Sequence, residues 1–151
     1  MEPLRVDDAD ELGGLLDDER LHRYIGGRAK TREELRAQYA RQVAGVSKGW
    51  HNWVVRRRDA GTIVGTVQAT LFDDHGRPAA ELAWVVVTEQ QGNGYAREAA
   101  AAIAAWLRRQ GVDVFVAHVH PEHAASIAVA RGLGMTPGAT RGDGEVRWTS
   151  P

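Results

Sequence analysis

Residues 81–96 read ELAWVVVTEQQGNGYA and carry the strongest structural signal in this chain. The first part, residues 81–87, ends in five apolar residues, which is typical of a strand covered on both faces. A loop with Gly92 and Gly94 follows, and an alanine-rich helix is expected over residues 95–109. Such a junction directs several free backbone N–H groups and the positive end of a helix dipole to one place. The sequence therefore predicts an anion site suited to phosphate.

Two common kinds of phosphate-binding loop do not fit this stretch. A nucleotide P-loop has four residues between its glycines and then Lys-Ser or Lys-Thr, and neither feature is present. A dinucleotide-binding loop needs a third glycine at a position where this chain has Arg97. Taken alone, the two glycines are also compatible with a purely structural turn.

The rest of the chain predicts a single α+β domain over residues 1–151. An acidic N-terminal helix is indicated by Leu12, Leu15 and Leu16, with Asp7 or Asp8 available as its N-cap. Period-two patterns predict strands over residues 50–58, 62–72, 81–87 and 112–120, with a hairpin turn at 59–61, a second turn at 73–78, a short helix at 124–131 and a tail hairpin whose clearer arm is 145–148. An antiparallel meander thus leads into a strand–loop–helix–strand unit.

A second helix follows the capping box that Thr31 and Glu34 form. Leu35, Tyr39, Val43 and Val46 recur at helical spacing, so we expect all four on one buried face. Of the five tryptophans, Trp106 and Trp148 are expected in the core.

Composition and charge exclude several functions. The 151 residues include 19 Lys and Arg and 20 Asp and Glu, and a net charge of −1 argues against nucleic acid as the main partner. The absence of cysteine excludes disulfides, thiolate metal sites and thiol nucleophiles. No apolar run approaches 18 residues and the N-terminus leads into acidic residues, so we expect no membrane partner and a cytoplasmic location.

Two motifs resemble one family. The segment QGNGYA, residues 91–96, resembles the Gln/Arg-x-x-Gly-x-Gly/Ala signature of the GNAT superfamily of N-acetyltransferases, and Glu98-Ala99 resembles its RimJ/RimL-like branch. Residues 120–126, HPEHAAS, and the later Leu133-Gly134-Met135 resemble that branch's Pro-x-Asn-x-x-Ser helix and its closing motif. The resemblance covers nearly the whole chain.

The resemblance implies a GNAT fold and acetyl-CoA as the acetyl donor. In this fold a mixed, mostly antiparallel sheet is flanked by helices, and the parallel strands 81–87 and 112–120 splay apart. The pantetheine arm would pair with backbone groups of Val85, Val86 and Val87, and His123 stands where the family has an Asn that contacts the arm. The pyrophosphate would lie on the N–H groups of Gln91, Gly92, Asn93, Gly94, Tyr95 and Ala96.

The resemblance also implies direct attack of an amine on the thioester in a ternary complex. Glu81 matches a strand-start carboxylate that serves as base, often through water. The family's usual acid is a Tyr seven residues past the motif Asn, but that position is Ala130 here. In RimL-like relatives the motif Ser takes this part, so Ser126 is the candidate acid.

The acceptor is expected to be a primary amine: a peptide α-amine, an amino acid or a small amine. Early helices and meander strands build its pocket in the family, which here makes candidates of Tyr24, in a turn at 21–27, and of Trp50, Asn52, Trp53 and Gln68. His118 and His120 share one face at the end of their strand, where either could carry a proton. One of the tryptophans at 50 and 53 is expected in the core and the other in the pocket, and the acidic N-terminus is compatible with a cationic acceptor.

Three alternatives stay open. His118, His120 and His123 resemble the metal-binding run of metallo-β-lactamase-like hydrolases, although no later histidine completes it. We therefore expect no metal. The missing Tyr and the His-for-Asn exchange are also compatible with a catalytically silent CoA-binding sensor. A homodimer is compatible with the resemblance as well.

Overall fold

The computed structural model describes residues 1–25 and 28–151 and contains one seven-stranded sheet in the order β1-β2-β3-β4-β5-β7-β6. The strands are β1 (Glu2–Pro3), β2 (Trp50–Arg56), β3 (Ile63–Asp74), β4 (Arg77–Val86), β5 (Val114–Val119), β6 (Thr136–Thr140) and β7 (Val146–Thr149). All neighbours pair antiparallel except β4 and β5, which are parallel. The α+β class and the mixed, mostly antiparallel sheet are confirmed.

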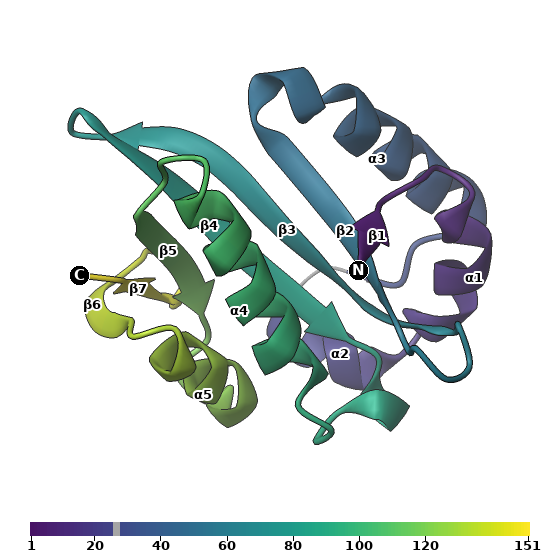
Figure 1. The fold of residues 1–151 in the computed structure, drawn as a ribbon. Coiled ribbons are helices and arrows are strands. Elements are labelled where there is room, and N and C mark those ends of the chain that lie inside the picture. Colours follow the sequence, from purple (N-terminus) through teal and green to yellow (C-terminus); the bar gives the residue numbers. More distant parts are fainter. Residues whose placement is uncertain (26–27) are drawn as a thin grey trace.

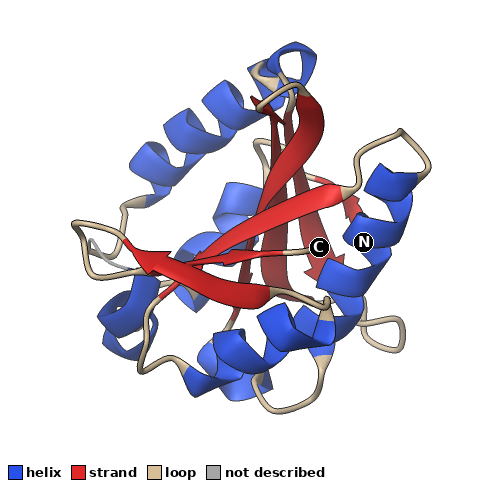
Figure 2. Ribbon diagram, turned by 90° about the vertical axis from the view of Figure 1, so that its left-hand side faces the viewer, coloured by secondary structure: helices blue, strands red, loops and turns tan. Residues whose placement is uncertain are grey.

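Helices cover both faces of this sheet (Figures 1 and 2). They are α1 (Asp8–Leu15), α2 (Glu19–Ile25), α3 (Arg32–Ala44), α4 (Tyr95–Arg108) and α5 (Ala124–Gly132), with single 3-10 turns η1 (Val46–Lys48) and η2 (Thr88–Gln90). The larger core lies under α4, where Ile103 and Leu107 pack on Val67, Leu82 and Phe115. A smaller core joins α1 and α3 to β2 and includes Leu12, Leu35, Tyr39 and Val54.

The β3–β4 hairpin is longer than expected. Pairing begins at Asp74 and Arg77, so β4 starts four residues before the predicted 81. The turn is only His75-Gly76, with φ of 56° and 85°, and two positive φ values are what a tight two-residue hairpin needs. Pro78 suggested a longer turn, but the strand accommodates it close to its start.

Three local expectations about the N-terminal half need correction. Tyr24 lies in α2 and not in a turn, while residues 26 and 27 of that predicted turn lie outside the described residues. Val43 and Val46 are 41% and 50% exposed, because the core contacts of α3 end at Tyr39. Asp7 stands at the N-cap of α1, but its carboxylate binds Arg36 at 2.7 Å instead of capping the helix.

The capping box of α3 and the burial of Trp148 are confirmed. The predicted tail hairpin is also present, with β7 placed between β5 and β6. Trp106 is partly buried and packs edge-on against Trp53 with 5.5 Å between ring centroids. In the described residues, no helix is long and apolar enough to cross a membrane.

Candidate active site

The site is built around the separation of β4 from β5. The parallel ladder has only three residue pairs and ends at Glu81 opposite Val116. Beyond this point β4 continues to Val86 as the partner of β3, and β5 continues to Val119 as the partner of β7. The predicted splay of two parallel strands is therefore confirmed, and the two strand edges that face each other beyond Glu81 form no ladder.

The ladder with β3 decides which backbone groups of β4 stay free in this opening. The N–H of Val87 donates to the carbonyl of Val64 at 2.9 Å, so it is used within the sheet. Because the bonding direction alternates along an antiparallel pair, Val85 also directs its groups toward β3, while Trp84 and Val86 direct theirs toward the opening. Of Val85, Val86 and Val87, which were expected to pair with a ligand, only Val86 directs its backbone groups toward the opening. Trp84 does so as well.

The glycine loop presents its backbone to solvent at one end of this opening. Gly92 and Gly94 have φ of 78° and 80°, which side chains disfavour, and no atom lies within 4 Å of a Cβ built at either position. Gly94 is the N-cap of α4, so the first N–H groups of that helix lack helical acceptors. The loop thus has the geometry of an anion site.

Side-chain amides hold the loop in this shape. Gln91 Nε2 donates to the carbonyl of Val86 at 3.0 Å, and Asn93 Nδ2 donates to the carbonyls of Gln90 and Gln91. Because these amides already contact the loop's own backbone, its N–H groups and not its side chains are the parts left to meet an anion.

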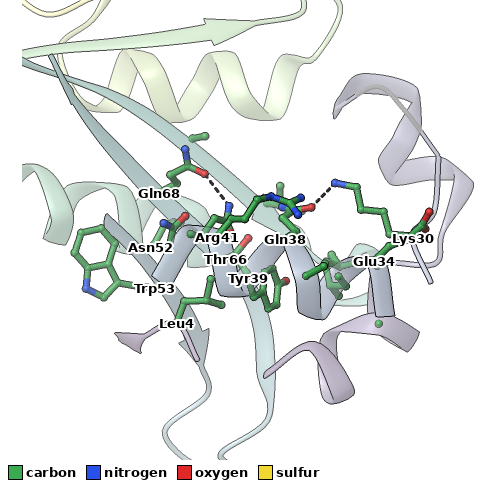
Figure 3. A pocket seen from close by; sticks show the side chains of 18 of the residues that line it. Leu4, Lys30, Glu34, Gln38, Tyr39, Arg41, Asn52, Trp53, Thr66 and Gln68 are labelled. Atoms are coloured by element: carbon green, nitrogen blue, oxygen red, sulfur yellow. Dashed lines mark hydrogen bonds between the residues drawn. The ribbon is translucent and has the colours of Figure 1, made fainter. Parts of the chain in front are cut away.

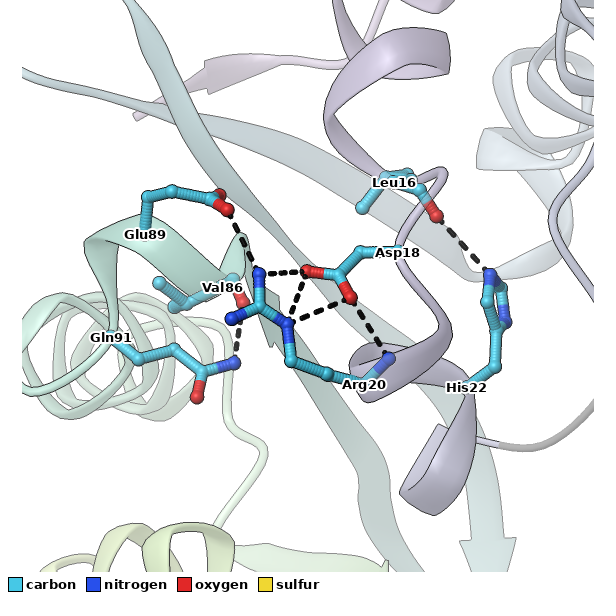
Figure 4. A network of polar contacts seen from close by, with 7 residues as sticks. All are labelled: Leu16, Asp18, Arg20, His22, Val86, Glu89 and Gln91. Carbon is cyan, nitrogen blue, oxygen red and sulfur yellow. Dashed lines mark hydrogen bonds and ion pairs between the residues drawn. The ribbon is translucent and has the colours of Figure 1, made fainter.

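An ion-pair network ties α2 to the strand end beside this loop (Figure 4). The guanidinium of Arg20 binds Asp18 at 2.8 Å and reaches Glu89 of η2 at 3.1 Å. Hydrogen bonds from Arg20 hold the pKa of the Asp18 carboxyl well below its usual range. Arg20 and Glu89 are 67% and 65% exposed, so their contact links α2 with η2 but contributes little to stability.

Glu81 lies where the opening begins, and its carboxylate Oε1 is 3.1 Å from Nδ1 of His118. The Glu81 side chain is 48% exposed, whereas the His118 side chain is only 13% exposed. Both stand on the sheet face opposite α4, because Ala117 and Val119 point into the core under α4. A carboxylate accessible to a substrate is therefore held by an imidazole behind it.

Ser126 lies on the other face, in the first turn of α5, and is buried. Its Oγ accepts a hydrogen bond from Nε1 of Trp84 at 3.2 Å. The indole of Trp84 therefore links β4 to α5 across the opening. Since Oγ acts as acceptor in this bond, the hydroxyl proton of Ser126 remains free for donation.

His120 and His123 meet α2 through Tyr24. The imidazole of His123 stacks on the Tyr24 ring with 4.4 Å between centroids and 7° between planes, and His120 is tilted at 5.6 Å. Burial, and secondly the nearby His120, lowers the pKa of His123. The described residues contain no group of three or more side chains able to hold a metal, since His118 turns to Glu81 and the other two turn to Tyr24.

A cavity of about 700 Å³ lies between α3 and the sheet (Figure 3). It reaches β4 at Ala83, Trp84 and Val85, next to the unpaired edge. Of the predicted acceptor residues, Asn52, Trp53 and Gln68 line this cavity, whereas Tyr24, Trp50, His118 and His120 do not.

One of the tryptophans at 50 and 53 was expected in the core and the other in the pocket, and this is wrong for Trp50, which is in neither. Trp53 lines the cavity and packs against Trp106, whereas Trp50 is 43% exposed beside Gly45. Sequence reasoning missed the polar side of α3, where Glu34, Gln38, Arg41 and Gln42 line the cavity. Their spacing of i, i+4, i+7 and i+8 was the available signal.

The fold and site together define an acetyltransferase of the GNAT class. A family model described as "Acetyltransferase (GNAT) domain" matches residues 1–136, so the chain belongs to this family. No curated protein matches the sequence. The family and the comparisons lend no support to a silent sensor domain.

Several solved structures share the whole fold. RimL, the ribosomal L7/L12 α-N-protein acetyltransferase, solved with CoA, has a TM-score of 0.84 and 16% identity over 98% of this chain and 90% of its own. The aminoglycoside acetyltransferase AAC(6')-Ib, solved with paromomycin and acetyl-CoA, has a TM-score of 0.82 and 15% identity, over 99% of this chain and 90% of its own. The ribosomal-protein-S5-alanine acetyltransferase of Vibrio fischeri has a TM-score of 0.82 and 18% identity, over 99% of this chain and 90% of its own.

Proposed function

We propose that this protein transfers the acetyl group of acetyl-CoA to a primary amine by direct attack in a ternary complex. The observation that carries the proposal is the separation of β4 from β5 beyond Glu81, with an open glycine loop at one end and a cavity opening on β4. The opening suits an extended pantetheine arm, which forms amide hydrogen bonds as a strand does.

In this proposal the backbone of Trp84 and the N–H of Val86 pair with the pantetheine amides, since the carbonyl of Val86 already accepts from Gln91 Nε2. The N–H groups of the loop bind the pyrophosphate: those at the N-terminus of α4 lack helical acceptors, and only the N–H of Gln91 is used within the loop, where it donates to the carbonyl of Thr88. His123 takes the place of the usual Asn, and its ring contacts the arm after Tyr24 shifts from the stack.

Transfer requires an uncharged amine, a polarised carbonyl and a proton for the leaving thiolate. We assign proton removal from the attacking amine to Glu81, directly or through a water, with His118 as its positioning residue. The amine nitrogen bonds to the thioester carbon, the carbon–sulfur bond breaks, and Ser126 donates its hydroxyl proton to the thiolate. The indole N–H of Trp84 then stabilises the serine oxygen.

Thermal unfolding with acetyl-CoA, CoA and NAD, followed by calorimetry, tests the cofactor. Ligand at a hundred times its dissociation constant stabilises a one-site protein by about 2.7 kcal/mol, a rise of several degrees at this size. We expect this rise with acetyl-CoA and CoA but not with NAD. Release of the CoA thiol in the presence of amines then tests transfer, and no shift with any ligand would refute the proposal.

Two further parts of the proposal concern the protein in its cell. We infer a cytoplasmic location and a homodimer, which the resemblance to the RimJ/RimL-like branch supports. Light scattering with multi-angle detection measures the mass in solution, and a monomer mass would refute the dimer.

A further inference from the structure

The cavity between α3 and the sheet has an unequal distribution of charge. Its charged lining residues are Arg28, Lys30, Glu34 and Arg41, in addition to His22. Arg28 Nη1 donates to Glu34 Oε2 at 2.9 Å, and this contact lowers the pKa of Glu34 to about 2. Glu34 is therefore an anion at neutral pH and is matched by Arg28, so that this pair adds no net charge to the cavity.

Lys30 and Arg41 are left as uncompensated cations. Lys30 Nζ donates to the neutral amide oxygen of Gln38, and in the described residues neither Lys30 nor Arg41 forms an ion pair with a carboxylate. Figure 3 shows both side chains on the same side of the cavity, with Gln38 between them. Glu34 also lies within the field of Lys30, and the three cations Arg28, Lys30 and Arg41 against the single anion Glu34 leave the lining with an excess of two positive charges.

The many acidic residues of the N-terminal segment do not change this balance. Asp7 and Asp10 of this segment bind Arg36, while Asp8 and Glu11 bind Arg56. None of these four acids lines the cavity. The acidic N-terminus therefore serves to hold α1 against α3 and β2, and the expectation that it favours a cationic acceptor is not supported by the charges around the cavity.

A polar path connects the cationic lining with the reacting end of the site. Gln42 Nε2 donates to Gln68 Oε1 at 3.4 Å, and Gln68 Nε2 donates to Thr70 Oγ1 at 3.0 Å. Thr70 is paired with Glu81 in the sheet. From Glu81 this path runs through Thr70, Gln68 and Gln42 to the part of α3 that lines the cavity beside Lys30 and Arg41.

We propose that the acceptor is a peptide α-amine with an acidic side chain among its first few residues. This inference rests on the proposed function and names its substrate class. The amine lies at the Glu81 end, and the acidic side chain reaches along the cavity to Lys30 and Arg41.

Matched peptides test this selectivity. The probes are Ala-Glu-Glu-Ala, Ala-Gln-Gln-Ala and Ala-Arg-Arg-Ala, each with a C-terminal amide, and paromomycin as a non-peptide polycation. Because Lys30 and Arg41 are exposed and exposed ion pairs contribute little each, we expect kcat/KM several-fold higher for the acidic than for the neutral peptide. The arginine peptide and paromomycin should be poorer still, and added salt should reduce the differences.

Charge reversal in the protein gives the second arm. Lys30→Glu and Arg41→Glu should each lower kcat/KM for the acidic peptide several-fold and narrow or invert the preference over the arginine peptide. Lys48→Glu, at an exposed residue of η1 that does not line the cavity, is the control and should keep the preference. The thermal shift with acetyl-CoA should be equal in all three variants.

The outcomes separate the two proposals. Equal rates for all peptides, or a better rate for paromomycin, would overturn the acidic acceptor while leaving acetyl transfer in place. Binding of acetyl-CoA with acetylation of free amino acids alone would overturn the acidic acceptor in the same way. Absence of both acetyl-CoA binding and transfer would refute the proposed function, and the acceptor class with it.

Discussion

The carboxylate of Glu81 meets the imidazole of His118 where β4 and β5 begin to separate, with 3.1 Å between Oε1 and Nδ1. The parallel ladder ends at Glu81, so the carboxylate borders the opening that follows, while the histidine behind it is almost covered. The contact restricts the carboxylate to one orientation. Such a fixed, accessible carboxylate is what a base acting on a bound amine requires.

Glu81→Gln is therefore expected to lower kcat by about 10²–10⁴-fold, the usual contribution of a positioned base. The KM for acetyl-CoA should change little, because the carboxylate lies apart from the glycine loop. His118→Gln should have a smaller effect, and adding it to Glu81→Gln should cost little more, since the two act as a unit.

The control for these two variants is Glu89→Gln, which removes an exposed carboxylate from η2, between β4 and the glycine loop. Steady-state kinetics of CoA release should show Glu89→Gln close to the parent protein. Equal losses in the Glu81 and Glu89 variants would point to a general effect of charge and would contradict the assignment of the base.

Ser126→Ala and Trp84→Phe together show whether Ser126 acts as a proton donor or only holds the indole of Trp84. Each variant loses the 3.2 Å hydrogen bond and should lower stability by about 1 kcal/mol. Only Ser126→Ala removes the proton that the thiolate would take, so its kcat should fall at least tenfold further than that of Trp84→Phe. Equal kcat values in two variants of equal stability would show that the serine only holds the tryptophan.

The order of strands around the loop could be predicted from sequence because each signal there is local. Residues 81–87 end in five apolar residues, which predicts a buried strand. The glycines at 92 and 94 predict a loop, and the alanine-rich stretch after them predicts a helix, so the order strand–loop–helix follows from local signals alone. The separation of the strands came from the family resemblance and not from any pattern, since a splay depends on which later strand pairs with β5.

Contacts between distant segments could not be predicted in this way. Nothing in the sequence indicates that Trp84 reaches Ser126, or that Tyr24 stacks on His123, because each pair joins elements whose relative placement depends on the whole core. The short helix α2 was missed for a related reason: its residues Glu19–Ile25 are separated from α1 by only three residues and are followed by glycines in the sequence, so the pattern resembles a turn.

Gly94→Ala should weaken acetyl-CoA binding and lower stability. The residue has φ of 80°, where an alanine costs about 1–2 kcal/mol. Gly14→Ala is the matched control, because Gly14 lies in α1, is exposed and has free space around a Cβ. It should raise stability by up to about 1 kcal/mol and leave binding unchanged. Calorimetry with acetyl-CoA and thermal unfolding measure both effects, and an unaltered affinity in Gly94→Ala would argue against the loop as the anion site.

Acid should destabilise the protein through its partly buried histidines. Burial lowers the pKa of His123, and also that of His51 beside Trp53 and Trp106. Below about pH 6.5 the unfolded chain therefore binds more protons than the folded one, so the free energy of unfolding falls as the pH falls toward the folded-state pKa values.

Thermal unfolding between pH 7.5 and 5 tests this dependence, well above the pKa of about 2 that Glu34 has in the folded protein. We expect the melting temperature to decline with acid in the parent protein and to decline less steeply in His123→Asn, which keeps a polar side chain but cannot take up a proton. His51→Asn should reduce the slope independently, because the two rings lie in separate clusters. If the melting temperature of the variant with both His51→Asn and His123→Asn declined with acid as steeply as that of the parent protein, other groups would cause the acid sensitivity.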